Sequence, residues 1–196
     1  MTEIKIKETA LELFATRGYE STTMRDIGKA VGIKGSSIYA HFRSKDEIFL
    51  QIAADLKEKI IWENIDVDTL KNSNIEVELK PLLFGVFKNY YTFFAEHNLE
   101  LLFWQRLRFF PPVKLSESVD INRLLYSNSV LERYMELFQY GMDHKQLRKN
   151  TLPVLVISFF ALVSGYADSL IAVPLRLLDQ ELEEGFNIYW DGIKMR

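Results

Sequence analysis

Apolar residues recur at helical spacing along almost the whole chain, and this pattern constrains the fold more than any other feature. Near the N-terminus, Ile6, Ala10 and Phe14 share one helical face, and similar stripes follow in later segments. No stretch shows the strict alternation of apolar and polar residues that marks a half-buried strand. The sequence therefore predicts an all-α protein, and its 196 residues are enough for a small domain attached to a larger one.

Two short helices joined by a tight turn are predicted directly after the first helix. Gly18 supplies a stop for the first helix, and Thr23 with Asp26 three residues later resembles a capping box. Gly32 ends the second helix, and Lys34 opens the third almost at once. Two short helices with a glycine in the connecting turn form a helix-turn-helix. A compact helical corner without any ligand is the plain alternative.

The positive charge of the chain is concentrated in this region. The segment from Ser21 to Lys45 carries five cations and one anion, a local charge of +4. Because the whole chain has a net charge of −3, the other residues together carry −7. A basic island on an acidic body indicates local contact with a polyanion. The chain has no cysteine, which excludes disulfides and thiolate metal sites.

The third predicted helix, Lys34–Arg43, separates into an inner and an outer face. Gly35, Ile38 and Phe42 point toward the first two helices, at spacings of three and four residues. The outer side is small, hydrogen-bonding and free of acids, so backbone and hydroxyl groups can approach the phosphates and base edges of DNA. Lys45, at the start of the next helix, can reach the same strand.

The stretch TTMRDIGKAVGIKGSSIYAHFRSKDEIF, residues 22–49, resembles the DNA-binding signature of the TetR/AcrR family of transcriptional regulators. The similarity reaches back through ALELFATRGYESTT, residues 10–23, and so covers about the first quarter of the chain. It implies an N-terminal three-helix, helix-turn-helix DNA-binding domain whose 34–42 helix lies in the major groove. Carried over by position, the residues expected to contact DNA are Thr23, Arg25, Lys34, Ser36, Ser37, Tyr39, His41 and Lys45.

The resemblance also implies a larger helical domain for ligand binding and dimerisation. We expect a DNA-binding domain over residues 1–47 and an effector-binding and dimerisation domain over 48–196, with the helix 48–64 as connector. The polar segment IDVDTLKNSN, residues 65–74, is expected to be a loop. Further helices are predicted near residues 76–96, 99–110, 120–143, 152–173 and 179–194.

Ten aromatic residues lie within 35 positions between Glu76 and Phe110. Core packing alone explains many such clusters, whereas the family resemblance implies an effector pocket among these helices. Asn128 and Asp168 fall on otherwise apolar stripes, and a buried polar side chain needs a partner from the backbone, an interface or a ligand. The residues expected around a small apolar or aromatic effector are Phe87, Tyr90, Phe94, Phe103, Asn128 and Asp168.

The segment Leu152–Leu175 is nearly apolar, and such a helix is either buried or membrane-spanning. Asp168 and Pro174 interrupt it, which favours burial and leaves a membrane-associated helical protein as an alternative. Members of the family dimerise through two C-terminal helices of each chain, whereas packing of this helix pair within one chain is the plain alternative. The residues expected at a dimer interface are Phe160, Gly165, Leu182, Phe186 and Trp190.

Together these features predict a cytoplasmic, homodimeric transcriptional regulator, with repression as the expected mode. It would bind a near-palindromic site in double-stranded DNA and be released by a small effector. A helical enzyme is the alternative of a different class. The chain has three histidines, no H-E-x-x-H sequence and no P-loop pattern, so no catalytic residue, metal site or cofactor is predicted. His97 beside Glu96 and Glu100 comes nearest to a metal-binding cluster, and a solvated helix end explains it better.

Overall fold

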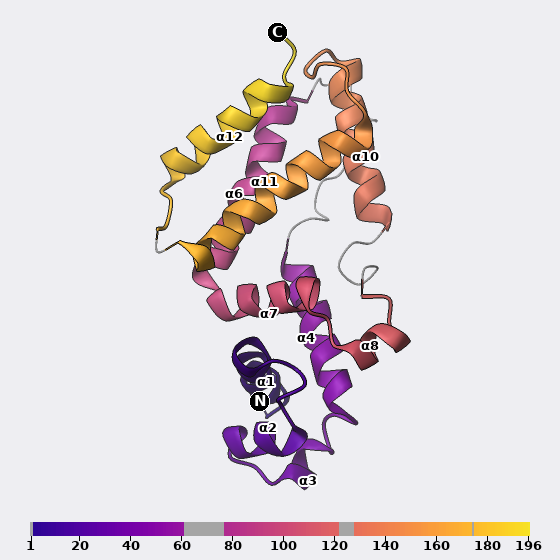
Figure 1. Cartoon of the computed structure of the whole chain (residues 1–196), viewed down its shortest axis with the longest axis vertical. Coiled ribbons are helices and arrows are strands. Elements are labelled where there is room, and N and C mark those ends of the chain that lie inside the picture. The colour runs from indigo at the N-terminus through magenta and orange to yellow at the C-terminus, as the bar shows by residue number, and fades with distance from the viewer. Residues whose placement is uncertain (1, 61–76, 122–127, 174) are drawn as a thin grey trace. The chain divides into compact units, whose positions relative to one another are not determined.

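Figure 1 shows the computed structural model of the chain, which describes residues 2–60, 77–121, 128–173 and 175–196. Over these residues the secondary structure is helical, and the single β-type pairing is an isolated bridge between Leu147 and Lys194. The helices are α1 (Thr2–Arg17), α2 (Met24–Val31), α3 (Gly35–Ile38), α4 (Lys45–Lys59), α6 (Leu79–Glu96), α7 (Asn98–Phe109), α8 (Val113–Ser118), α10 (Asn128–Asp143), α11 (Leu152–Ala172) and α12 (Asp179–Ile193). The predicted all-α fold is confirmed.

The chain divides into two compact units. The N-terminal unit comprises Met1–Lys59 and His97–Leu125, and the C-terminal unit comprises Ile60–Glu96 and Tyr126–Arg196. The first unit therefore contains α1 to α4 together with α7 and α8. The functional division between residues 47 and 48 stays a prediction. The predicted loop 65–74 and the end of the 48–64 connector lie outside the described residues.

Local sequence signals set the helix ends of the N-terminal unit. Gly18 and Gly32 follow α1 and α2 with φ angles of 87° and 82°, a left-handed conformation that glycine adopts without steric cost. Thr23 caps α2 in a full capping box, in which its hydroxyl accepts from the Asp26 amide and the Asp26 carboxylate accepts from the Thr23 amide. These three predicted signals are confirmed.

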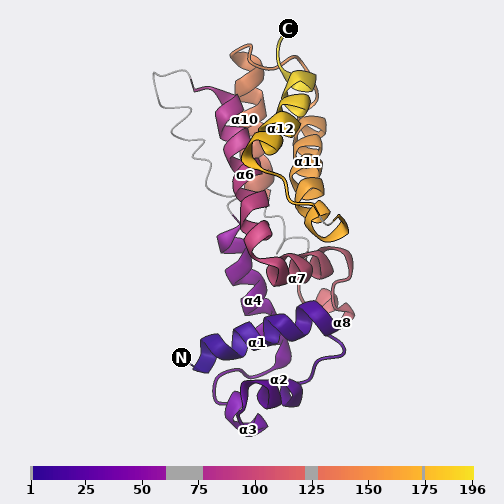
Figure 2. The same cartoon turned by 90° about the vertical axis from the view of Figure 1, so that its left-hand side faces the viewer.

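The core of the N-terminal unit joins α7 to the helix-turn-helix. α7 packs against α1 on the side opposite to α2 and α3 (Figures 1 and 2). Phe103 of α7 is buried with its ring 4.9 Å from that of Phe49 on α4. Phe49 also packs edge-on against Phe14 and Tyr19, at 5.3 and 5.0 Å between ring centroids. One aromatic cluster thus holds α1, α4 and α7 together.

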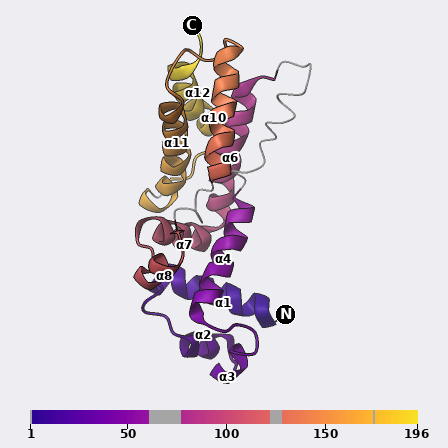
Figure 3. The ribbon, with the colours of Figure 1, turned by 90° about the vertical axis from the view of Figure 1, so that its right-hand side faces the viewer.

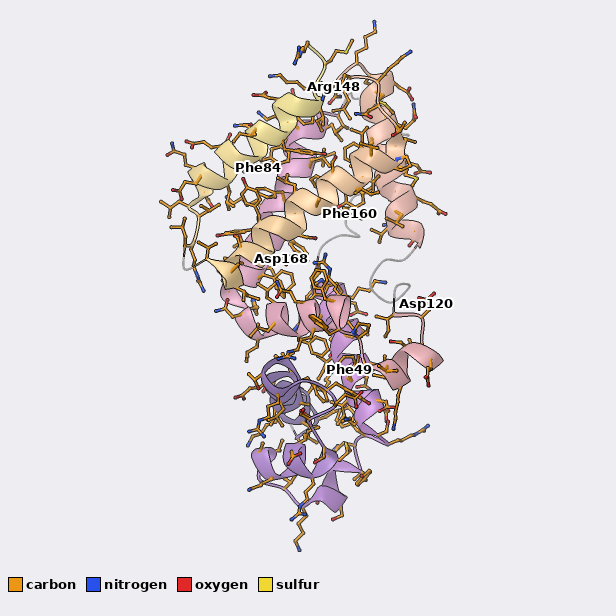
Figure 4. The ribbon with its side chains drawn as sticks, viewed as in Figure 1. Phe49, Phe84, Asp120, Arg148, Phe160 and Asp168 are labelled. Carbon is orange, nitrogen blue, oxygen red and sulfur yellow. The ribbon has the colours of Figure 1, made fainter. Side chains whose placement is uncertain are left out.

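The C-terminal unit is built around α6, which packs against both α11 and α12, while α10 packs against α11 (Figure 3). Phe87 of α6 meets Tyr166 of α11 edge-on and Phe186 of α12 at 5.8 Å. Phe84, one turn earlier, lies between α6 and α12 and contacts the same Phe186 at 5.3 Å (Figure 4). The aromatic residues of α6 therefore supply much of this unit's core.

The helix α11 leaves a large part of its apolar surface uncovered. Within the described residues it alone is long and apolar enough to cross a membrane, and 28% of its most apolar 18-residue window is buried. Val154 and Ile157 are exposed by 52% and 67%, and Ala161 and Gly165 continue the exposed stripe at helical spacing. A stripe of this kind marks a surface that another molecule covers.

Candidate nucleic-acid interface

The recognition segment, residues 34–43, is shorter as a regular helix than the sequence predicts. Regular α-helix covers only Gly35–Ile38, and the chain continues in turns, with the amide of His41 donating to the carbonyl of Ile38 at 2.9 Å. No side chain accepts a hydrogen bond from the free amides at the start of α3, so its first turn lacks the stabilisation that a capping residue provides. The predicted separation of faces nevertheless holds, because Ile38 and Phe42 are fully buried.

The outer side of the recognition segment is open to solvent. Tyr39 is 58% exposed and presents both a ring and a hydroxyl. No acidic residue occurs between Asp26 and Asp46. The predicted DNA-contacting residues that are exposed are Thr23, Arg25, Lys34, Ser36, Ser37, Tyr39 and His41. Cations, hydroxyls and an imidazole can donate to phosphates and base edges of a duplex.

The donor groups of Thr23 are already used inside the protein. Its hydroxyl donates to the Asp26 carboxylate at 2.5 Å, and its amide donates to the same carboxylate at 3.0 Å. These hydrogen bonds hold the pKa of Asp26 below its ordinary value. A phosphate contact from Thr23 would have to replace one of these bonds, so the role that the geometry supports is a helix cap.

Lys45 is likewise turned into the protein. Its ammonium donates to the backbone carbonyl of Tyr19 at 2.7 Å and lies 3.8 Å above the centre of the Tyr19 ring. The Tyr19 hydroxyl in turn donates to the carboxylate of Asp46. Burial lowers the pKa of Lys45 and raises that of Tyr19, which the bond to Asp46 raises further. Lys45 thereby ties the start of α4 to the turn between α1 and α2.

The predicted effector residues fall in different parts of the structure. Phe87, Tyr90 and Phe94 are buried on α6, with the Tyr90 and Phe94 rings packed edge-on. Phe103, in contrast, belongs to the N-terminal unit, where its ring packs against that of Phe49. Asp168 is half-buried on α11 (Figure 4), and Asn128 begins α10 with its side chain outside the described part.

The predicted dimer residues divide into exposed and buried ones. Gly165 is exposed, and an added Cβ there would meet no atom within 4 Å. Leu182, Phe186 and Trp190 are buried in the core of the C-terminal unit itself. The sequence predicts this stripe on α12 but not what covers it, and in the structure the stripe packs within the chain, as the plain alternative expects. Phe160 is half-buried on α11 and meets Tyr134 edge-on (Figure 4).

Two features of the N-terminal unit escaped the sequence patterns. α8 is a six-residue helix directly after Pro111 and Pro112, and no helix was expected there. Arg106 of α7 hydrogen-bonds the end of α1 through its guanidinium, and the sequence of this largely apolar segment gives no reason to expect that contact. Among the described residues, no group of three histidine, aspartate or glutamate side chains is placed to hold a metal ion, and His97 is the residue before α7.

The N-terminal region is similar to known regulators. The profile of the family described as "Bacterial regulatory proteins, tetR family" matches residues 6–52. The biofilm operon icaADBC HTH-type negative transcriptional regulator IcaR of Staphylococcus aureus (strain Newman) is 49% identical over 47 residues. That match covers 24% of this chain and 25% of IcaR, so the chain aligns with about a quarter of the length of this relative.

Solved structures extend the similarity to the whole fold. A TetR family transcription regulator from Marinobacter aquaeolei VT8 matches with a TM-score of 0.69 and 15% identity, over 100% of this chain and 96% of that one. The ketosteroid transcriptional regulator KstR2 of Mycobacterium tuberculosis matches with a TM-score of 0.68 and 20% identity, over 100% and 96%. The proteins matched are described as transcription regulators. Residues 6–52 of this chain are therefore similar to the tetR family of bacterial regulatory proteins, and the whole chain shares the fold of solved structures described as members of that family.

Proposed function

We propose that the protein is a cytoplasmic repressor of transcription that binds a specific DNA duplex through the recognition segment. The observation that carries this proposal is the solvent-open outer side of residues 34–43, a segment without acidic residues that follows the capped helix α2. Arg25, Ser36 and Ser37 are the candidates for reading bases, and Lys34, Tyr39 and His41 for holding phosphates. The negative regulator IcaR, similar over this same region, supports repression as the mode.

A homodimer is the second part of the proposal. The exposed apolar stripe of α11, with Val154, Ile157 and Gly165, would pack against the same helix of a second copy, and the exposed Ile188 of α12 would lie at its edge. Gly165 would let the two helix backbones approach closely. A two-fold pair of recognition segments would require a near-palindromic site with half-sites one helical turn apart. Pairing would also bury the exposed apolar surface of α11 against protein, so this surface would not require a membrane to cover it.

A small apolar or aromatic effector completes the proposal. Tyr90 and Phe94 on α6, together with Asp168 on α11, are the residues proposed to receive it. Binding can release DNA only if the effector has different affinities for the DNA-bound and the free conformation. DNA binding can be measured without an effector, so the DNA-binding and effector parts of the proposal can be tested separately.

The test is selection of duplexes from a random library by the full chain, followed by titration of the selected duplex and a scrambled duplex at several salt concentrations. We expect the selected duplex to bind at least about a thousandfold more tightly than the scrambled one. Lys34→Met should lower the slope of log K against log salt by about 0.9 for each chain bound, or about 1.8 for a dimer on its site. Lys149→Met, at an exposed lysine of the C-terminal unit, should leave the slope unchanged. Equal affinity for both duplexes would refute the proposal.

A further inference from the structure

The arginine at position 106 completes the C-terminal end of another helix. Its Nε donates to the carbonyl of Ala15 at 2.8 Å, and one terminal nitrogen donates to the carbonyl of Thr16 at 3.2 Å. Both carbonyls belong to the last turn of α1, where no further turn of helix supplies amide donors. The amide of Gly18 already serves the carbonyl of Phe14. The guanidinium therefore donates hydrogen bonds to carbonyls at the end of α1 that lie beyond the reach of the helix's own amides.

Arginine suits this position for physical reasons. The C-terminus of a helix carries partial negative charge, so a cation there is favourable. The planar guanidinium presents several donors in a fixed fork, and it stays charged at every physiological pH. A lysine ammonium would keep the charge but lose the fixed fork. The Arg106 terminal nitrogen also lies close to Gly18, where an added Cβ would come within 3.3 Å of it.

Hydrogen bonds around the end of α1 connect this helix to both α2 and α4. Directly after Gly18, the Tyr19 carbonyl accepts from Lys45 of α4, and the Thr22 hydroxyl donates to the carbonyl of Gly18 at 2.8 Å. Thr23 then caps α2. A shift of the α1 terminus would therefore move the entry to α2 and the start of α4 together.

From this geometry we infer that Arg106 is a positioning residue for DNA binding: its fork fixes the α1–α2 turn, and through it the recognition segment. The inference rests on the proposed function and adds a route of regulation to it. α7 begins one residue after α6 ends, with only His97 between them. If an effector displaced α6 and α7 followed it, Arg106 would transmit that movement to the end of α1. Arg106 itself does not touch DNA.

The experiment compares wild type, Arg106→Met and Arg106→Lys in the full chain, with the duplex selected by wild type. Arg148→Met, at an exposed arginine of the C-terminal unit (Figure 4), is the matched control. Circular dichroism first sets a temperature at which all variants are fully folded. We expect Arg106→Met to weaken binding about three- to tenfold, Arg106→Lys to weaken it less, and the control to bind as wild type.

The salt dependence separates positioning from direct contact. Loss of one phosphate contact per chain lowers the salt slope by about 0.9 for each chain bound, as expected for Lys34→Met, whereas loss of positioning leaves the slope unchanged. Wild-type affinity of folded Arg106→Met would overturn the inference, and so would a lowered salt slope. If Arg106→Met does not fold, wild-type affinity of Arg106→Lys overturns it instead. Failure of wild type to distinguish selected from scrambled duplex would instead refute the proposed function.

Discussion

Gly185 is the position in the C-terminal unit where one added methyl group has the clearest expected cost. A Cβ there would lie 2.8 Å from Cζ of Tyr166 and closer still to its hydroxyl, whereas ordinary contact begins at 3.4 Å. The Tyr166 ring cannot swing away freely, because it packs edge-on against the buried Phe87 at 4.8 Å. Replacing glycine by alanine inside a helix gains about 1 kcal/mol. Overpacking costs about 1–3 kcal/mol, and an approach this close to the Tyr166 hydroxyl lies in the upper part of that range, about 2–3 kcal/mol, so the net expectation is a loss of about 1–2 kcal/mol.

The same helix provides a control for this substitution. An added Cβ at Gly192 would meet no atom within 4 Å, so Gly192→Ala should be neutral or stabilising by up to about 1 kcal/mol. Thermal unfolding at one fixed protein concentration measures both variants, and Gly185→Ala should lower the midpoint by about 2–8 °C. In a Tyr166→Ala background the same substitution should cost little. The reasoning fails if Gly185→Ala is as stable as wild type while Tyr166 is present.

Three further outcomes are expected. The pKa of Asp26 is lowered in the folded protein, so Asp26 stabilises the fold at pH values above its ordinary pKa of 3.8, and this stabilisation is lost as the pH falls through the folded-state pKa. Asp26→Asn should therefore flatten the acid limb of a plot of unfolding free energy against pH. An unchanged acid limb would contradict this. Ile157→Glu should abolish the proposed dimer in analytical ultracentrifugation. The control Ile4→Glu changes an isoleucine of α1 whose exposed fraction, 60%, is similar to the 67% of Ile157, and it should leave the dimer intact. A dimer in both variants would argue against the α11 interface. Lys45→Met should lower the unfolding free energy by about 0.5–1.5 kcal/mol without changing the salt slope of DNA binding. A slope lowered by about 0.9 for each chain bound would show that Lys45 contacts phosphate after all.

The N-terminal helices could be predicted in detail because local chemistry decides them. Gly18 and Gly32 adopt the left-handed conformation expected of helix-ending glycines, and Thr23 forms the expected capping box. The inner positions Ile38 and Phe42 are buried as their spacing predicts. Periodicity overstated the length of α3, because apolar spacing continues through Phe42 while regular helix hydrogen bonding does not.

Contacts between segments distant in sequence were beyond prediction. Nothing in the periodicity of residues 98–109 indicates that Phe103 packs on Phe49 of α4, or that Arg106 serves carbonyls of α1. Spacing defines a stripe on α12 but does not identify what covers it, and Leu182 and Phe186 are covered by the unit's own core. The direction of the Lys45 ammonium is equally invisible in sequence, because a lysine beside a basic segment could turn either way.

If chains pair through the uncovered stripe of α11, as proposed, the stripe has a consequence for how the protein would respond to its own abundance. While chains are scarce, each would remain single and hold Val154 and Ile157 in water. Pairing would then rise with the square of chain concentration, and only a pair would present two recognition segments to both half-sites. A modest change in expression would thereby be converted into a larger fractional change in promoter occupancy.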